Sequence, residues 1–236
     1  ITVDEMFKKG FDAIFIGTGT ALPKALDVPG ARLRGVVQSS YLLHMVSIFN
    51  QNTITRDRVP LVEGEKVGII GCGNVAMDAA RTAVRLGASS VSVIYHRTES
   101  EMSAIQSEYQ EAVKEGVNFM WETSTTEFIG DEKGCLKALR ANTRQGEQVI
   151  PFDRIYLAIG SRPANRIVST TTGIDVDDNG YIIVKERPFG MTTRKGVFAG
   201  GDVVHHPQTV VLAMKAAKQV AVGIAQYVDA IKLLES

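Results

Sequence analysis

The chain has 236 residues, 26 of them basic and 26 acidic, so its formal net charge is zero. Its composition, 44% hydrophobic and 22% charged, is typical of a globular protein with enough material for one large domain or two modest ones. The balanced charge favours neither nucleic acid nor a membrane surface as a partner, and no apolar run is long enough to span a bilayer. The few cysteines and the lack of an export signal predict a cytoplasmic protein.

The first predicted element is a buried parallel strand at residues 11–16 (FDAIFI), which ends in the glycine-rich loop Gly17-Thr18-Gly19. The apolar residues of segment 39–50 recur with helical spacing. The stretch 53–65 is polar and carries proline and glycine, which predicts a domain boundary near residue 60.

A βαβ unit follows this boundary. Residues 66–70 (KVGII) and 91–95 (VSVIY) are predicted strands, separated by an alanine-rich helix at 74–86. Ser103 and Gln106 have the spacing of a capping box and predict the start of a second helix. Alternating strands and helices of this kind indicate a parallel sheet in an α/β fold.

The rest of the chain is predicted to contain strands at 117–121, 152–159, 181–185 and 196–199, antiparallel strands within 126–148 and a long helix at 209–234. Two segments resemble each other: FDAIFIGTGT at 11–20 and FDRIYLAIGS at 152–161. Two strands that end in the same way support a duplicated nucleotide-binding fold.

The loop after the first strand of the βαβ unit has the pattern GxGxxA. Gly71 allows a tight turn, Gly73 lets a pyrophosphate approach the backbone, and Ala76 lets the helix lie close to the sheet. Asn74 and Val75 begin the helix, whose N–H groups and dipole would face the phosphates. The position between a strand and a helix favours dinucleotide binding over a glycine-rich turn with no ligand.

The tip of the second strand bears on which dinucleotide is bound. NAD enzymes usually carry an acid about 20 residues after the glycine loop, but here the sequence has His96 and Arg97. A guanidinium suits the 2′-phosphate of NADP, so NADPH is favoured. The alternative is that Arg97 is a solvated surface residue and that Glu99 or Glu101 binds the ribose.

Neither the two cysteines nor any carboxylate pair suggests further chemistry. Cys72 and Cys135 lie far apart and have neither CxxC nor metal-ligand spacing, so no metal site is expected. Cys72 is interpreted as a small residue that fills the loop. Hydride transfer to a flavin needs no protein acid or base, so no catalytic residue is assigned.

Four stretches together resemble the small subunit of NADPH-dependent glutamate synthase. They are GCGNVAMDAAR at 71–81, VIYHRTESEM at 93–102, GVFAGGDVV at 196–204 and TVVLAMKAAKQVA at 209–221. The resemblance covers nearly the whole chain, although Ser103 stands where the family often has proline. The same flavoprotein module occurs in the electron-bifurcating ferredoxin–NADP oxidoreductase, in a sulfide dehydrogenase subunit and in dihydropyrimidine dehydrogenase.

This resemblance implies an oxidoreductase in which NADPH passes hydride to FAD. Electrons would then leave through iron–sulfur clusters towards a large catalytic or electron-accepting subunit. Besides the loop residues already named, the implied cofactor-binding residues are Gly17, Gly19, Gly201, Asp202, Thr209 and Val210 for FAD, and Ala158 and Gly160 beside the nicotinamide cleft.

The resemblance also implies two Rossmann-like domains. An NAD(P)-binding domain at 61–165 would be inserted into a discontinuous FAD-binding domain at 1–60 and 166–236. The family's N-terminal GxGxxG for FAD and its cysteine-rich cluster sequence do not occur here, so the sequence predicts a truncated piece of a longer protein, with any iron–sulfur clusters in the missing part. Such a piece would bind nucleotide without turnover. The alternatives are an NAD-linked relative of the bifurcating or sulfide-linked kind, or a non-catalytic nucleotide-binding module.

Overall fold

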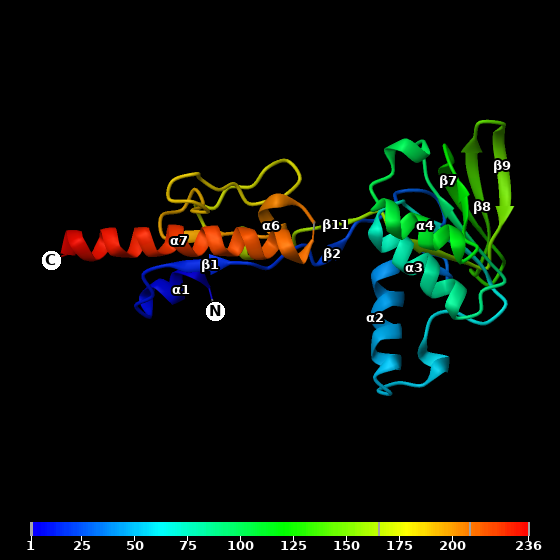
Figure 1. Cartoon of the computed structure of the whole chain (residues 1–236), viewed down its shortest axis with the longest axis horizontal. Coiled ribbons are helices and arrows are strands. Elements are labelled where there is room, and N and C mark those ends of the chain that lie inside the picture. Colours follow the sequence, from blue (N-terminus) through cyan, green and yellow to red (C-terminus); the bar gives the residue numbers. More distant parts are fainter. Residues whose placement is uncertain (1, 165, 208, 236) are drawn as a thin grey trace. The chain divides into compact units, whose positions relative to one another are not determined.

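A computed structural model describes residues 2–164, 166–207 and 209–235, and the chain in it forms two compact units (Figure 1). The central unit comprises Ala25–Ile159, and the terminal unit comprises Ile1–Lys24 with Gly160–Ser236. Residues 25–60 therefore belong with the dinucleotide loop and not, as the sequence predicted, with the terminal segments. The reason is that β3 (Val36–Gln38) hydrogen-bonds in parallel to β10 (Arg154–Leu157), a pairing that no local pattern reveals.

The central unit is built on a five-stranded parallel sheet with the order β3-β10-β4-β5-β6. Its other strands are β4 (Lys66–Ile70), β5 (Ser90–Ile94) and β6 (Asn118–Met120), and its helices are α2 (Ser39–Asn50), α3 (Asn74–Arg85) and α4 (Gln106–Lys114), with short 3-10 turns at Arg56–Arg58 and Glu99–Glu101. The predicted βαβ unit is thus present as β4-α3-β5.

Alternate residues of the strands divide between two apolar cores because side chains of a strand point to opposite faces. Val67 and Ile69 of β4 pack with Leu42 of α2 and with the alanines of α3. Ile70 lies in the other core, together with Phe128 and further side chains of a three-stranded antiparallel sheet. That sheet consists of β7 (Ser124–Gly130), β8 (Leu136–Thr143) and β9 (Gly146–Pro151), in the region where antiparallel strands are predicted.

The terminal unit contains two short sheets and a long helix. β1 (Ile14–Ile16) pairs in parallel with β12 (Val197–Ala199), and β2 (Leu22–Pro23) pairs with β11 (Ser161–Arg162) in the antiparallel sense. The helices are α1 (Val3–Lys8), α5 (Arg166–Ser169), α6 (Asp202–His205) and α7 (Val210–Glu235). The long helix predicted from the apolar pattern is α7, the red helix in Figure 1.

The predicted strand at 181–185 is reduced to isolated bridges. Ile182 pairs with Val176 across the turn at residues 177–180, and Val184 pairs with Thr192. Asp177 closes the turn, since its Oδ1 accepts hydrogen bonds from the N–H groups of Asn179 and Tyr181. Across the described residues, no helix is both long enough and apolar enough to cross a lipid bilayer.

Candidate functional site

The candidate site lies at the carboxyl edge of the central sheet, where strand order reverses. The chain passes from β4 to β5 on one side, whereas β10 lies on the other side of β4. The loops after β4 and β10 both leave the sheet at this edge, and α/β proteins bind ligands where the strand order reverses in this way.

Gly71 fills the tight turn that the pattern predicts. Its φ is +115°, and a Cβ there would lie 2.4 Å from the carbonyl oxygen of Ala158. Ala158 is held in this position because its N–H donates to the Ile70 carbonyl at 2.8 Å. Any side chain at Gly71 would thus collide with the backbone that follows β10.

The helix start beyond this turn carries no side-chain cap among the described residues. Gly73 is the N-cap of α3. Val75 is 48% exposed, whereas Ala76 is fully buried against the sheet. The N–H groups of the first turn and the helix dipole are therefore free of an internal acidic or hydroxyl cap, as a phosphate-binding loop requires.

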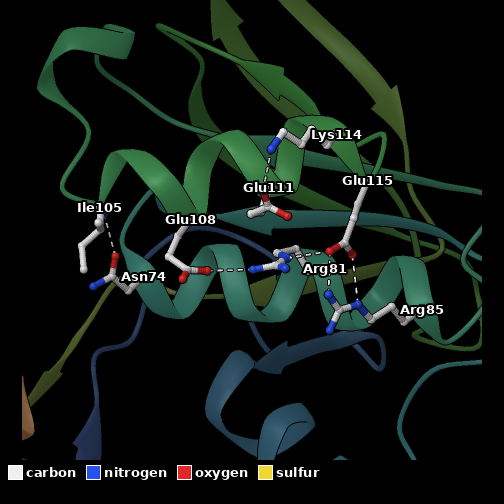
Figure 2. A network of polar contacts seen from close by, with 8 residues as sticks. All are labelled: Asn74, Arg81, Arg85, Ile105, Glu108, Glu111, Lys114 and Glu115. Carbon is white, nitrogen blue, oxygen red and sulfur yellow. Dashed lines mark hydrogen bonds and ion pairs between the residues drawn. The ribbon is translucent and has the colours of Figure 1, made fainter.

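The start of α4 is hydrogen-bonded to the same loop. Asn74 Oδ1 accepts the N–H of Ile105 at 2.8 Å (Figure 2), and the Cys72 carbonyl accepts the N–H groups of Ser103 and Ala104 at 3.2 and 3.1 Å. The capping box predicted for Ser103 and Gln106 is wrong: the N-cap of α4 is Ile105, no side chain of the described residues caps the helix, and Asn74 of α3 accepts the N–H of Ile105 itself.

Cys72 lies between the two glycines and is only 2% exposed. Its burial, with a smaller contribution from Glu99, raises the pKa of the thiol to about 11. Cys72 and Cys135, both in the described part of the chain, are free. A protonated thiol without a partner cysteine fits the role of a loop-filling residue.

His96 and Arg97 follow β5 and are both exposed. The Arg97 Nε donates to His96 Nε2 at 3.2 Å, which leaves the rest of the guanidinium facing solvent. The backbone around them is fixed by the end of β6, because the N–H groups of Glu122 and Thr123 donate to the carbonyls of Arg97 and Tyr95, each at 2.9 Å.

The two acids that could replace Arg97 as the ribose-binding group already have protein partners. Glu101 accepts hydrogen bonds from Thr98 through its N–H at 3.1 Å and its hydroxyl at 2.8 Å, and these bonds lower the pKa of Glu101. Burial, followed by a hydrogen bond to Glu99, raises the pKa of the Tyr109 hydroxyl. In the structure, Glu101 therefore interacts with Thr98, and Glu99 interacts with Tyr109 of α4.

A hollow of about 590 Å³ lies at this end of the sheet. Its lining residues are Thr98, Glu99, Ser100, Met102, Gln106, Trp121, Glu122 and Arg144. Arg144, from the β8–β9 turn, forms an ion pair with Glu122. Both residues lie in turns that are distant in the sequence, so no local pattern reveals this pair.

The predicted flavin residues cluster at the carboxyl edge of β1 and β12. The register pairs Ile16 with Ala199, so Gly17 and the Gly200-Gly201 turn leave the sheet side by side. Gly201 has φ +75°, and a Cβ there would lie 4.0 Å from Ala213 in the first turn of α7.

The other predicted residues of the terminal unit lie on the same turns or on the connecting strands. Asp202 begins α6, Thr209 Oγ1 accepts the Leu212 N–H at 3.4 Å, and Val210, at the start of α7, is 77% exposed. Gly19 has φ +61°, and Gly160, with φ +91°, accepts the N–H of Lys24 at 2.9 Å.

A parallel sheet with a GxGxxA loop at its switch point, interrupting a second α/β unit, defines the class of proteins with Rossmann-type dinucleotide-binding domains. The family model for pyridine nucleotide-disulphide oxidoreductases matches residues 2–217, and the chain belongs to this oxidoreductase family. The fold agrees with thioredoxin reductase of T. acidophilum, with a TM-score of 0.73 and 22% identity, over 93% of this chain and 66% of that one.

Curated relatives confirm the resemblance drawn from the motifs. The chain is 33% identical to the glutamate synthase [NADPH] small chain of Halomonas elongata, over 95% of this chain and 52% of the relative. It is 32% identical to the NADP(+)-dependent formate dehydrogenase subunit beta of Moorella thermoacetica, over 96% of this chain and 33% of the relative. The chain therefore spans about half or less of the length of these relatives.

Proposed function

We propose that the central unit binds NADPH, with the diphosphate at the N-terminus of α3 and the 2′-phosphate beside Arg97. The observation that carries this proposal is the uncapped helix start behind Gly71 and Gly73, at the reversal of strand order. Only glycine fits at Gly71, and the absence of a Cβ at Gly73 leaves its backbone open to a phosphate. Two relatives with NADP in their names support the choice of cofactor.

In the same proposal the terminal unit contributes part of an FAD site. Gly17, Gly201 and Asp202 would face the ribityl–phosphate portion, and the start of α7 would face the ring. The positive φ of Gly201 and its proximity to the first turn of α7 fit this role. The dipole of a helix N-terminus would stabilise the negative charge of a reduced flavin, which supplies the redox chemistry when bound.

The proposed activity is therefore transfer of hydride from NADPH to FAD, with electrons passed onward to a partner subunit. Two relatives are described as a small chain and as a subunit, which supports a partner of this kind. The 236-residue chain alone is expected to bind nucleotide without turnover. Cys72, buried and unpaired, gives no support to disulfide chemistry in this chain.

A second candidate is an NAD-linked relative. The acids Glu99 and Glu122 line the hollow together with Thr98, the residue after Arg97, and an acid near the end of the second strand usually binds the ribose hydroxyl of NAD. A third candidate, a nucleotide-binding module without redox function, would have no use for the flavin-facing residues of the terminal unit.

The test is calorimetric titration of the 236-residue chain with NADPH and with NADH. We expect tighter binding of NADPH, and a loss of roughly 10- to 100-fold in NADPH affinity in the Arg97→Ala variant, because a charge-assisted hydrogen bond to the 2′-phosphate is removed. Arg58→Ala is the matched control, since Arg58 is also an exposed arginine of the central unit. Equal or preferential binding of NADH would favour the NAD-linked candidate, and no binding of either would refute the proposal.

A further inference from the structure

Ser103 lies directly over the glycine that a diphosphate would approach. A Cβ placed on Gly73 would come within 3.3 Å of Ser103 Oγ; apart from Gly73 and its two chain neighbours, no other atom of the described residues lies within 4 Å of that position. Gly73 lacks a side chain on this side, which is where a bound diphosphate meets the loop. A phosphate oxygen occupying that space would therefore be within reach of the Ser103 hydroxyl.

The backbone at Ser103 is fixed before any ligand arrives. Its N–H and that of Ala104 both donate to the Cys72 carbonyl, and the next residue, Ile105, donates to Asn74 Oδ1 at 2.8 Å. The segment 103–105 is thus attached to the loop at two points. Binding a ligand at Ser103 would therefore require little further ordering of this backbone segment.

The Ser103 hydroxyl itself is only weakly engaged. Ser103 is exposed, and its Oγ donates to the Cys72 carbonyl at 3.4 Å, which is long for a hydroxyl donor. The Cys72 carbonyl already accepts two backbone N–H groups, so it loses little if the hydroxyl turns away. A rotation about χ1 would free the hydroxyl to donate elsewhere.

We propose that Ser103 is a diphosphate-binding residue whose hydroxyl donates a hydrogen bond to the dinucleotide. This inference rests on the proposed function and adds a third element to the cradle formed by the glycine loop and α3. Proline, which the resembled family often has at this position, would offer neither the hydroxyl nor the N–H that binds Cys72. Since NADH and NADPH share the diphosphate, Ser103 would strengthen the binding of both without distinguishing them.

The experiment compares the wild-type chain with Ser103→Ala, Ser103→Thr and a control, Ser107→Ala, an exposed serine of α4. Each is titrated with NADPH, with NADH and with 2′-AMP, which has a 2′-phosphate but no diphosphate. We expect Ser103→Ala to weaken both dinucleotides about tenfold, because a hydrogen bond to a charged group is lost. Ser103→Thr restores binding, while 2′-AMP affinity and the thermal unfolding midpoint stay unchanged.

Other outcomes separate this inference from the proposed function. Wild-type affinity of Ser103→Ala for both dinucleotides would overturn the role of Ser103 and leave the proposed function intact. An equal loss of 2′-AMP binding would also overturn it, since it would reveal a general distortion of the site. A wild-type chain that binds neither dinucleotide would refute the proposed function and this inference together.

Discussion

Cys72 lies at the centre of the proposed phosphate loop, but its thiol is expected to be unreactive. Burial raises its pKa to about 11, so the thiol stays protonated at any pH well below that value. The thiolate is the nucleophilic form, and this side chain is also only 2% exposed. Both factors act in the same direction and suppress its reactivity.

We expect a thiol reagent at pH 8 to label Cys72 only when the chain unfolds. The measurement is the rate of labelling in a Cys135→Ser variant, in which Cys72 is the single thiol. Full labelling of the same variant in denaturant is the control. Rapid labelling of the folded protein would show that the loop opens, and would contradict its rigid attachment to β10 and to the start of α4.

The individual residues differ in how far the sequence could reveal them. Gly71 and Ala76 were predictable because the conformation and packing they allow depend on residue type within one local pattern. The hydrogen bond between Asn74 and the start of α4 was not predictable, since its partner Ile105 is 31 residues away. The sequence indicates Ser103 only as a capping-box residue and as a departure from proline, because its place over Gly73 depends on how the chain returns to the loop.

At the scale of elements, a group of ion pairs joins α3 to α4 (Figure 2). Arg81 binds Glu108 and Glu115, each at 2.8 Å, and Arg85 binds Glu115 at 2.6 Å. Hydrogen bonds from Arg85 and then from Arg81 lower the pKa of Glu115 below its ordinary value of 4.5. Because α3 carries the phosphate loop and α4 begins beside it, these pairs hold the two sides of the cradle together.

The lowered pKa of Glu115 predicts a dependence of stability on pH. The folded state favours the ionised carboxylate, so its contribution is present above pH 4.5 and is lost as the pH falls through the folded pKa. We expect Glu115→Gln to lower the unfolding midpoint by roughly 2–4 °C at pH 7. The difference from wild type should disappear near pH 3.

Thermal unfolding between pH 3 and pH 7 measures this effect, with Glu132→Gln as the control because Glu132 is an exposed carboxylate of a turn. A destabilisation by Glu115→Gln that is the same at both ends of this range would contradict an ionic contribution. It would point to packing by the Glu115 side chain.

Elements with strong internal periodicity were predicted well, and those defined by distant pairing were not. β4, α2 and α3 begin at the predicted residues because each combines an apolar pattern with a local start. The strand predicted at 181–185 failed because its alternating pattern meets only isolated partners at Val176 and Thr192. A turn pattern can bring two segments together without supplying a strand long enough to form a ladder.

At the scale of the whole molecule, the repeated segments 11–20 and 152–161 lie in parallel strands of different units. β1 and β10 each lead into the glycine-bearing turns that the repeat predicted. Their aromatic positions differ, however: Tyr156 is fully buried under α2 and α3, whereas Phe15 is 47% exposed. The fold class followed from the sequence, but the boundary near residue 60 did not, because β3 joins the central sheet through β10.

The division into two units predicts where a bound dinucleotide stabilises the chain. If NADPH binds at the loop after β4, ligand binding should stabilise the central unit by about 2.7 kcal/mol at a hundredfold excess over Kd. We expect slower amide hydrogen exchange in β4, β5 and α3, with little change in β1, β12 and α7, because the proposed NADPH-binding residues belong almost entirely to the central unit. Exchange measured with and without NADPH by mass spectrometry tests this.

The Gly71→Val variant is the control, because its side chain would collide with the Ala158 carbonyl, and it is expected to lose the protection. Equal protection of both units in the wild type would place the ligand elsewhere, or show that the two units respond as one.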